Sequence, residues 1–180
     1  CVVNVMGLAN VIDSLAAVRE VVFGTGDCGA QDLLEALRDD FTGHERLQAR
    51  LQTCPRFGNA DSRADELAQD ISGFVFSELR EHAPWRGGRY IPACLMFTNY
   101  AYFGKPVGAT PDGRRAGAPI ADSAGAMQGR DTAGPTALLQ SVAHIRHHLA
   151  PGTLVVNARL SKKMLSSPET REKLKTLVRT

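Results

Sequence analysis

The sequence has no apolar run that approaches the roughly 20 residues a membrane-spanning helix needs. Its first residues lack the basic flank and the cleavage pattern of a secretory leader, so we expect no signal peptide. It also has no internal repeat, low-complexity tract or long linker. With these absences, 180 residues amount to about one globular domain's worth of chain.

An excess of charge of one sign is also missing. The formal net charge is +2, so electrostatics give no reason to expect a nucleic acid or an anionic membrane as partner. Apolar residues make up 43% of the chain and charged residues 22%, which is ordinary for a soluble protein that buries a core.

The cysteines form no C-x-x-C pair, which argues against a zinc knuckle or a redox motif. They are widely spaced, at Cys1, Cys28, Cys54 and Cys94. Reduced thiols are therefore expected, and with them a cytoplasmic location. Cys54 has no neighbouring histidine or lysine that would depress its pKa, so we interpret it as unreactive.

Three histidines share a spacing that can bind a metal. They are His144, His147 and His148, at positions i, i+3 and i+4 of a predicted helix. The sequence indicates no fourth ligand and no adjacent acidic residue. We therefore expect no metal site here.

Apolar spacing predicts a mostly helical chain with two strands. The first helix has Asn10 as a possible cap, ends at Gly24 and Gly26, and carries a face of Leu8, Ile12, Leu15, Val18 and Val22. Five further helical segments follow, near 33–41, 45–51, 61–79, 135–149 and 167–178. Strands are predicted over Tyr90–Tyr102 and Thr153–Leu160. Two strands make no closed sheet of their own.

The central stretch Gly104–Pro119 reads GKPVGATPDGRRAGAP. Here Pro111 pre-sets a tight turn, Asp112 can close it, and Gly113 can adopt positive φ. Two interpretations remain open for the arginines that follow. They pair with carboxylates on a surface turn, or the turn is a scaffold that organises a neighbouring strand and an anionic group.

The chain resembles the C-terminal half of glycyl radical enzymes of the pyruvate formate-lyase type. The resemblance is carried by GATPDGRRAGAP and by GRDTAGPTALLQSVA, which runs from Gly129 to Ala143. Three further blocks agree in order: GLANVIDSLAAVREVVF (Gly7–Phe23), CPRFGNADSRADELA (Cys54–Ala68) and GTLVVNARLSKKML (Gly152–Leu165). Together the blocks span nearly the whole chain.

The resemblance implies an α/β fold, α+β in isolation, that forms part of a ten-stranded barrel. Residues 1–180 would be a single partial domain of that barrel. In the family a cysteine in a Gly-Cys-Val loop carries a thiyl radical, and a glycine in an Arg-Val-x-Gly-Tyr loop stores the radical. Neither motif occurs in this sequence. Cys1 is followed by Val-Val-Asn and does not match the cysteine loop, and no glycine lies in an Arg-Val-x-Gly-Tyr context. We therefore expect a fragment or truncated relative with no catalytic residue of its own.

The resemblance also implies where substrate binds. In the family the strand equivalent to Tyr90–Tyr102 contributes to the substrate pocket. Carried over by position, Thr98, Asn99 and Tyr100 would line it, with hydroxyl and amide groups that orient a small polar substrate. The alternative is that Tyr100 and Tyr102 are core aromatics with hydrogen-bonded hydroxyls.

The function implied is radical cleavage of a C–O or C–C bond. The candidate classes are a dehydratase or lyase for a diol, hydroxyproline or amino alcohol, which the blocks slightly favour, and a formate acetyltransferase. This chain would bind no cofactor, and the glycyl radical of the full-length enzyme would be installed by an activating enzyme that uses S-adenosylmethionine and an iron–sulfur cluster. The implied partners are this enzyme, a small-molecule substrate and further copies in a homo-oligomer. The alternative function is a non-catalytic scaffold or interaction protein.

Overall fold

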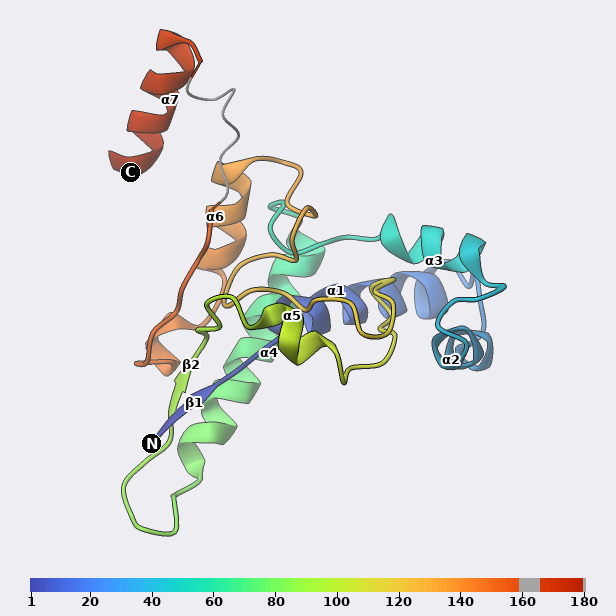
Figure 1. Ribbon diagram of the computed structural model, residues 1–180, viewed down its shortest axis with the longest axis horizontal. Coiled ribbons are helices and arrows are strands. Elements are labelled where there is room, and N and C mark those ends of the chain that lie inside the picture. Colours follow the sequence, from blue (N-terminus) through green and yellow to red (C-terminus); the bar gives the residue numbers. More distant parts are fainter. Residues whose placement is uncertain (159–165, 180) are drawn as a thin grey trace.

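The computed structural model describes residues 1–158 and 166–179, and most of these residues are helical (Figure 1). Two short strands, β1 (Val2–Asn4) and β2 (Ile91–Ala93), form the sheet. The helices are α1 (Leu8–Val18), the π-helix η1 (Arg19–Gly24), α2 (Ala30–Arg38), α3 (Glu45–Gln52), α4 (Ser62–Glu81), α5 (Tyr100–Gly104), α6 (Pro135–Ala143), the 3₁₀ helix η2 (His147–Leu149) and α7 (Pro168–Arg179).

The sheet is parallel, and its two strands are far apart in sequence. Val2 pairs with Ile91 and Asn4 with Ala93, so the start of the chain lies beside the segment after α4. Cys94 extends the parallel arrangement through a bridge to Leu154. The sequence did not indicate β1, because three residues are too few for an alternating pattern.

The predicted strand Tyr90–Tyr102 is wrong over most of its length. Only Ile91–Ala93 is a strand, Phe97 has φ +51°, and α5 begins at Tyr100. The chain leaves the sheet because the N–H of Met96 donates to Ser123 Oγ, at 3.0 Å, instead of to another strand. Aromatic density there reflects a turn and a short helix rather than a buried strand.

The predicted strand Thr153–Leu160 is also shorter than expected. Among the residues that the structure describes, only Leu154 forms a β-bridge there. Thr153 O accepts from the N–H of Cys94 at 2.9 Å, and Val155 N–H donates to Cys94 O at 3.1 Å. Arg159 and Leu160 lie outside the described residues.

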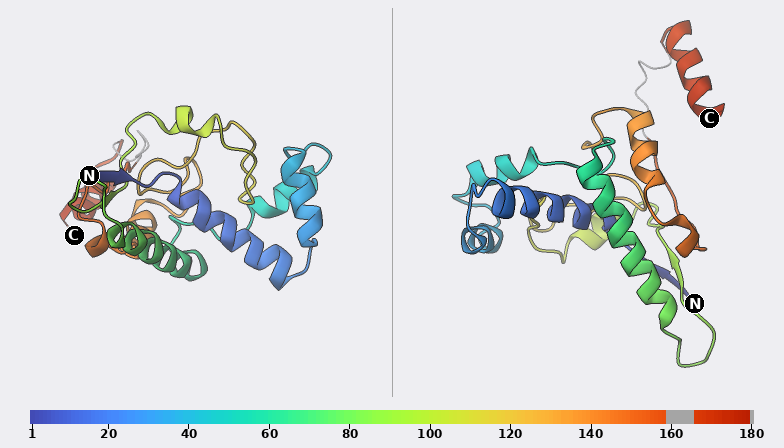
Figure 2. Two further views of the ribbon diagram at one scale, coloured as in Figure 1. Left: turned by 90° about the horizontal axis from the view of Figure 1, so that it is seen from below. Right: turned by 180° about the vertical axis from the view of Figure 1, so that it is seen from behind.

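The core consists of two clusters of buried side chains. The larger lies where α4 packs along α1 and α6, and it contains Ile12, Phe57, Phe76 and Leu138. The smaller lies under α2 and α3 and is built around Phe41. In the view from behind in Figure 2, α4 crosses in front of α1, and α2 and α3 lie at the far end of α1.

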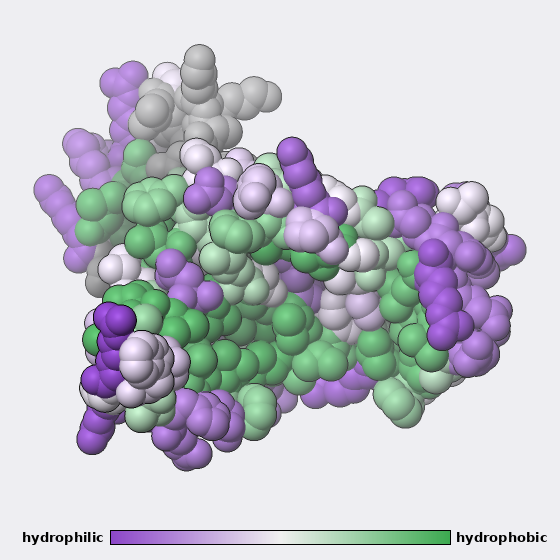
Figure 3. Space-filling model, turned by 60° about the horizontal axis from the view of Figure 1, so that its bottom comes forward, coloured by the Kyte–Doolittle hydropathy of each residue, from purple (hydrophilic) through white to green (hydrophobic). Residues whose placement is uncertain are grey.

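Helix α1 differs from its predicted amphipathic pattern. Gly7, with φ +73°, is the N-cap, whereas Asn10 lies inside the helix and is 5% exposed. Leu15 was expected inside but is 44% exposed, beside Val11 at 47%. Figure 3 shows a broad apolar area on the face that carries α1. Exposed apolar areas of this kind are typical of surfaces that contact further protein.

At Gly104, in α5, the backbone packs directly against the backbone of residues 118–119. A Cβ at this position would collide with the carbonyl oxygen of Ala118 and lie 2.9 Å from Cα of Pro119. We expect Gly104→Ala to lower the free energy of unfolding by roughly 3 kcal/mol, because backbone cannot move aside as a flexible side chain can. Chemical denaturation measures it. Gly108→Ala is the matched control, since a Cβ there meets no atom within 4 Å. Equal effects of the two substitutions would contradict the packing.

Candidate functional site

The central turn forms as the sequence predicts. Gly113 has φ +79°, and Thr110 O accepts from its N–H at 2.9 Å. The side chain of Asp112 closes the turn, because its Oδ1 accepts from the N–H of Arg114 at 3.2 Å.

Arg114 is buried and organises the backbone around the turn. Only 2% of it is exposed. Its guanidinium donates to four carbonyl oxygens, those of Val107, Gly108, Arg115 and Ala118. The contact with Ala118 O, at 2.7 Å, uses the same carbonyl that excludes a side chain at Gly104. Of the two interpretations left open, the scaffold turn is therefore the one that Arg114 fits.

Arg115 extends the scaffold toward the smaller core cluster. Its guanidinium donates to Asp40 O at 3.1 Å and to Gln48 Oε1 at 3.2 Å. The N–H of Ala116 donates to the carboxylate of Asp40 at 2.6 Å. The turn is thereby fixed to the segment after α2 and to α3.

The carboxylate of Asp112 joins the turn to α1 and to the loop at 120–132. Its Oδ2 accepts from Asn10 Nδ2 at 2.9 Å and from Arg130 Nη1 at 3.1 Å. The other end of the Asn10 amide accepts from the N–H of Ala121 at 2.6 Å. Asp112 is 1% exposed, so these bonds form where water cannot replace them.

A second buried carboxylate lies on α1 next to this network. Asp13 Oδ1 accepts from the N–H of Phe57 at 2.8 Å, and Oδ2 lies 3.7 Å from Arg56 Nη1. Burial raises the pKa of Asp13 to about 7, against the lowering effect of the Phe57 N–H and the Arg56 charge.

The predicted pocket residues lie at a separate hollow of about 880 Å³, which we call the Thr98 groove. Thr98 and Tyr100 line it, whereas Asn99, the N-cap of α5, does not. The walls are mostly apolar and come from the turn after β2 and from residues 155–158, with Leu95, Phe97, Val155 and Val156 among them. Tyr102 is 68% exposed and is not a core aromatic.

Asp122 and Asn157 supply the polar end of the Thr98 groove. Asp122 is 6% exposed and accepts from Asn157 Nδ2 at 2.6 Å and from Ser123 Oγ at 2.8 Å. Ser123 in turn accepts from the N–H of Met96, which fixes the turn that carries Thr98. Sequence reasoning missed Asp122 and treated its segment as a small-residue loop. An acid beside a serine in that loop was the available signal.

The histidines and the two buried cysteines lie elsewhere in the described part of the chain. No group of three or more metal-ligating side chains occurs there, and His147 Nε2 contacts Val142 O at 2.8 Å. Burial raises the pKa of Cys54, as its unreactive interpretation requires, and raises that of Cys94 to about 12. Among the described residues, no helix is long and apolar enough to span a membrane.

Two family models match the sequence. The model described as pyruvate formate lyase-like matches residues 1–104, and the model described as glycine radical matches residues 120–180. The chain belongs to the pyruvate formate lyase-like family. The family that the sequence blocks indicated is thereby confirmed.

Known members of the pyruvate formate lyase-like family match nearly the whole chain. Isethionate sulfite-lyase of Oleidesulfovibrio alaskensis is 36% identical over 97% of this chain and 21% of its own length. The glycerol-bound B12-independent glycerol dehydratase of Clostridium butyricum has a TM-score of 0.91 and 33% identity, over 99% of this chain and 23% of that one. A glycyl radical enzyme of Archaeoglobus fulgidus has a TM-score of 0.88 and 28% identity, with the same coverage.

The chain thus spans about a fifth of the length of the curated relatives it matches. Its helices and two parallel strands have the arrangement found in solved glycyl radical enzymes, so the predicted fold class is confirmed.

The raised pKa of Asp13 predicts a pH dependence of stability. Because the folded chain holds this proton more tightly than the unfolded chain, the stabilising contribution is complete below about pH 4 and is lost as the pH rises through about 7. Relative to Asp13→Asn, the wild type should lose up to roughly 4 kcal/mol of unfolding free energy between these values. Urea titrations at several pH values measure the difference. Parallel profiles for the two proteins would contradict a raised pKa.

Proposed function

We propose that the protein containing this chain is a glycyl radical dehydratase or lyase that cleaves a C–O or C–C bond of a small polar substrate. The chain supplies one wall of the substrate pocket. The proposal is supported by the name of the dehydratase with glycerol bound, and the isethionate sulfite-lyase makes release of sulfite by C–S cleavage the competing outcome of the test below. We favour the dehydratase and lyase branch over formate acetyltransferase.

The observation that carries the proposal is the composition of the Thr98 groove. Apolar walls suit a site that must keep water from radical intermediates, and a few polar groups line the same groove. Thr98 and Tyr100 offer hydroxyl groups that donate and accept, and Asp122 offers a carboxylate that accepts. Such a set orients the hydroxyl groups of a small substrate. We also propose Asn99 as a substrate contact, although it lies next to the groove rather than in its lining.

The reactive groups are proposed to lie elsewhere in the protein. A glycyl radical takes a hydrogen atom from a cysteine thiol. The resulting thiyl radical takes a hydrogen atom from the substrate, and the thiol returns one after the substrate bond has broken. The residues of this chain bind and orient the substrate and exclude water, and none is proposed to carry the radical.

We also propose that residues 1–180 are part of one larger domain, and that the protein is a cytoplasmic homo-oligomer in anaerobic metabolism. An S-adenosylmethionine iron–sulfur enzyme is the proposed activator.

The proposal is tested with the complete protein after activation. We expect Thr98→Val and Tyr100→Phe each to lower kcat/KM by about 10- to 100-fold on the best substrate among glycerol, propanediol, isethionate and hydroxyproline, because each removes one polar contact to the transition state. Steady-state kinetics give the values, and electron paramagnetic resonance checks that the glycyl radical content is unchanged.

Tyr102→Phe is the matched control, because Tyr102 lies two residues from Tyr100 on α5 but outside the lining of the groove. It should leave kcat/KM within about twofold of the wild type. If Tyr100→Phe and Tyr102→Phe have equal effects, the Thr98 groove is not the substrate site. If no glycyl radical forms and none of the four substrates reacts, the proposed activity itself fails.

A further inference from the structure

The described lining of the Thr98 groove contains one carboxylate and no positive charge to balance it. The carboxylate belongs to Asp122, and none of the described lining residues is a lysine, arginine or histidine. Asp122 is buried, and its partners among the described residues are neutral, the amide of Asn157 and the hydroxyl of Ser123. A buried charge is normally paired with an opposite one, because neutral donors replace only part of its hydration.

The other buried aspartates in the described part of the chain each have a positive group close by. The carboxylate of Asp112 lies 3.1 Å from Arg130 Nη1, and that of Asp13 lies 3.7 Å from Arg56 Nη1. Asp65 lies in the first turn of α4, where the helix dipole is positive. The aspartate of the groove differs from all three.

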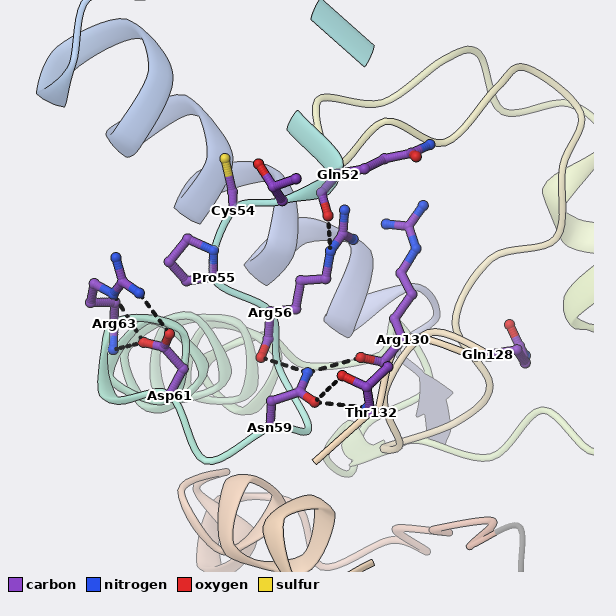
Figure 4. A pocket seen from close by; sticks show the side chains of 12 residues that line it. Gln52, Cys54, Pro55, Arg56, Asn59, Asp61, Arg63, Gln128, Arg130 and Thr132 are labelled. Carbon is purple, nitrogen blue, oxygen red and sulfur yellow. Dashed lines mark hydrogen bonds and ion pairs between the residues drawn. The ribbon is translucent and has the colours of Figure 1, made fainter. Parts of the chain in front are cut away.

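A second polar hollow, of about 590 Å³, has a balanced set of charges (Figure 4). Its lining includes Arg56 and Arg130, each of which has the aspartate named above beside it. The third arginine of its lining is Arg63, and Figure 4 shows this side chain turned toward Asp61, whose carboxylate lies 2.8 Å away. This hollow therefore offers no unmatched charge to a ligand, whereas the Thr98 groove does.

The carboxylate of Asp122 can accept further hydrogen bonds. A carboxylate has about four acceptor sites on its two oxygens. One bond is formed to each oxygen, because Oδ1 accepts from Ser123 Oγ at 2.8 Å and Oδ2 accepts from Asn157 Nδ2 at 2.6 Å. A ligand group with several N–H donors and a positive charge would use the remaining sites and balance the charge.

Aromatic side chains line the same groove. They are Phe97 and Tyr100, and Phe97 is 71% exposed although it belongs to the lining. The face of an aromatic ring attracts a cation, and the attraction is stronger where water is excluded. A groove that combines aromatic faces with a carboxylate suits an alkylammonium group better than it suits an anion.

We propose that Asp122 makes the Thr98 groove selective for a substrate with an ammonium group, so that the substrate is an amino alcohol. The inference rests on the proposed function, in which this groove is the substrate site. The ammonium group binds Asp122, which leaves the hydroxyl groups of Thr98 and Tyr100 for the alcohol. A neutral diol can donate to Asp122 but cannot balance its charge, and a sulfonate meets a like charge there.

The test measures binding to the complete protein before activation, so it does not depend on turnover. The probes are ethanolamine, ethylene glycol and isethionate, which share a hydroxyethyl group and carry an ammonium, a hydroxyl and a sulfonate at the other end. An alkyl amine is protonated at pH 7. By isothermal titration calorimetry we expect ethanolamine to bind at least tenfold more tightly than ethylene glycol, and isethionate to bind most weakly.

Asp122→Asn removes the charge and keeps the shape of the side chain. It should weaken the binding of ethanolamine at least tenfold and leave that of ethylene glycol within about threefold. Asp70→Asn is the matched control, because it changes the net charge by the same amount at an exposed position on α4. It should bind all three probes as the wild type does.

Phe97→Leu is a second variant, needed because Asp122→Asn also changes the bonds to Asn157 and Ser123. The exposed ring of Phe97 contributes little to the core, so the variant should fold as the wild type does. We expect it to weaken the binding of ethanolamine about threefold and to leave that of ethylene glycol unchanged. Its control is Phe23→Leu, at a phenylalanine that is 79% exposed on η1, outside the groove.

Two results would overturn the proposal. One is that the folded wild type binds isethionate as tightly as ethanolamine, or more tightly. The other is that Asp122→Asn and Phe97→Leu keep the wild-type preference for ethanolamine, and if Asp122→Asn does not fold, Phe97→Leu decides alone. A failure of the proposed function is seen separately, as the absence of turnover by the activated protein, and does not alter the order of binding.

Discussion

The hydrogen bonds of the Asp112 carboxylate are the contacts on which the arrangement of this chain depends. They join the turn to the inner face of α1, 102 residues away in sequence, and to Arg130 in the loop at 120–132, 18 residues away. A buried carboxylate is stable only when its oxygens are fully bonded, so each segment is held in place by the need to satisfy it. Arg114 completes the unit by donating to the carbonyl oxygens of Arg115 and Ala118.

The same bonds connect the scaffold to the Thr98 groove. Asn10 holds Asp112 with its nitrogen and the N–H of Ala121 with its oxygen, and the next two residues are Asp122 and Ser123. Ser123 then fixes the N–H of Met96, so the turn that carries Thr98 is set by the position of α1. A rigid support of this kind suits the pocket wall that we propose for this chain, because a substrate must be oriented closely for hydrogen-atom transfer.

The family, most helices and the central turn were predictable because each depends on local signals. Gly113 and Pro111 restrict backbone angles, and helix periodicity is read over a few turns. The long predicted strand before Tyr102 was wrong, because the bond from Met96 to Ser123 overrides local propensity. Asp122 was missed for the same reason: its bond to Asn157 joins residues 35 apart, and the adjacent serine is only a weak local signal of such a contact.

The central claim is that Asp112 and Asn10 act as one unit, and a double-mutant cycle tests it most directly. Unfolding free energies are measured for Asn10→Ala, Asp112→Asn and the combination, with Asn99→Ala replacing Asn10→Ala in a control cycle. We predict a coupling energy of about 1–2 kcal/mol for the first pair and additivity within about 0.5 kcal/mol for the control. Additive effects of Asn10→Ala and Asp112→Asn would contradict the claim.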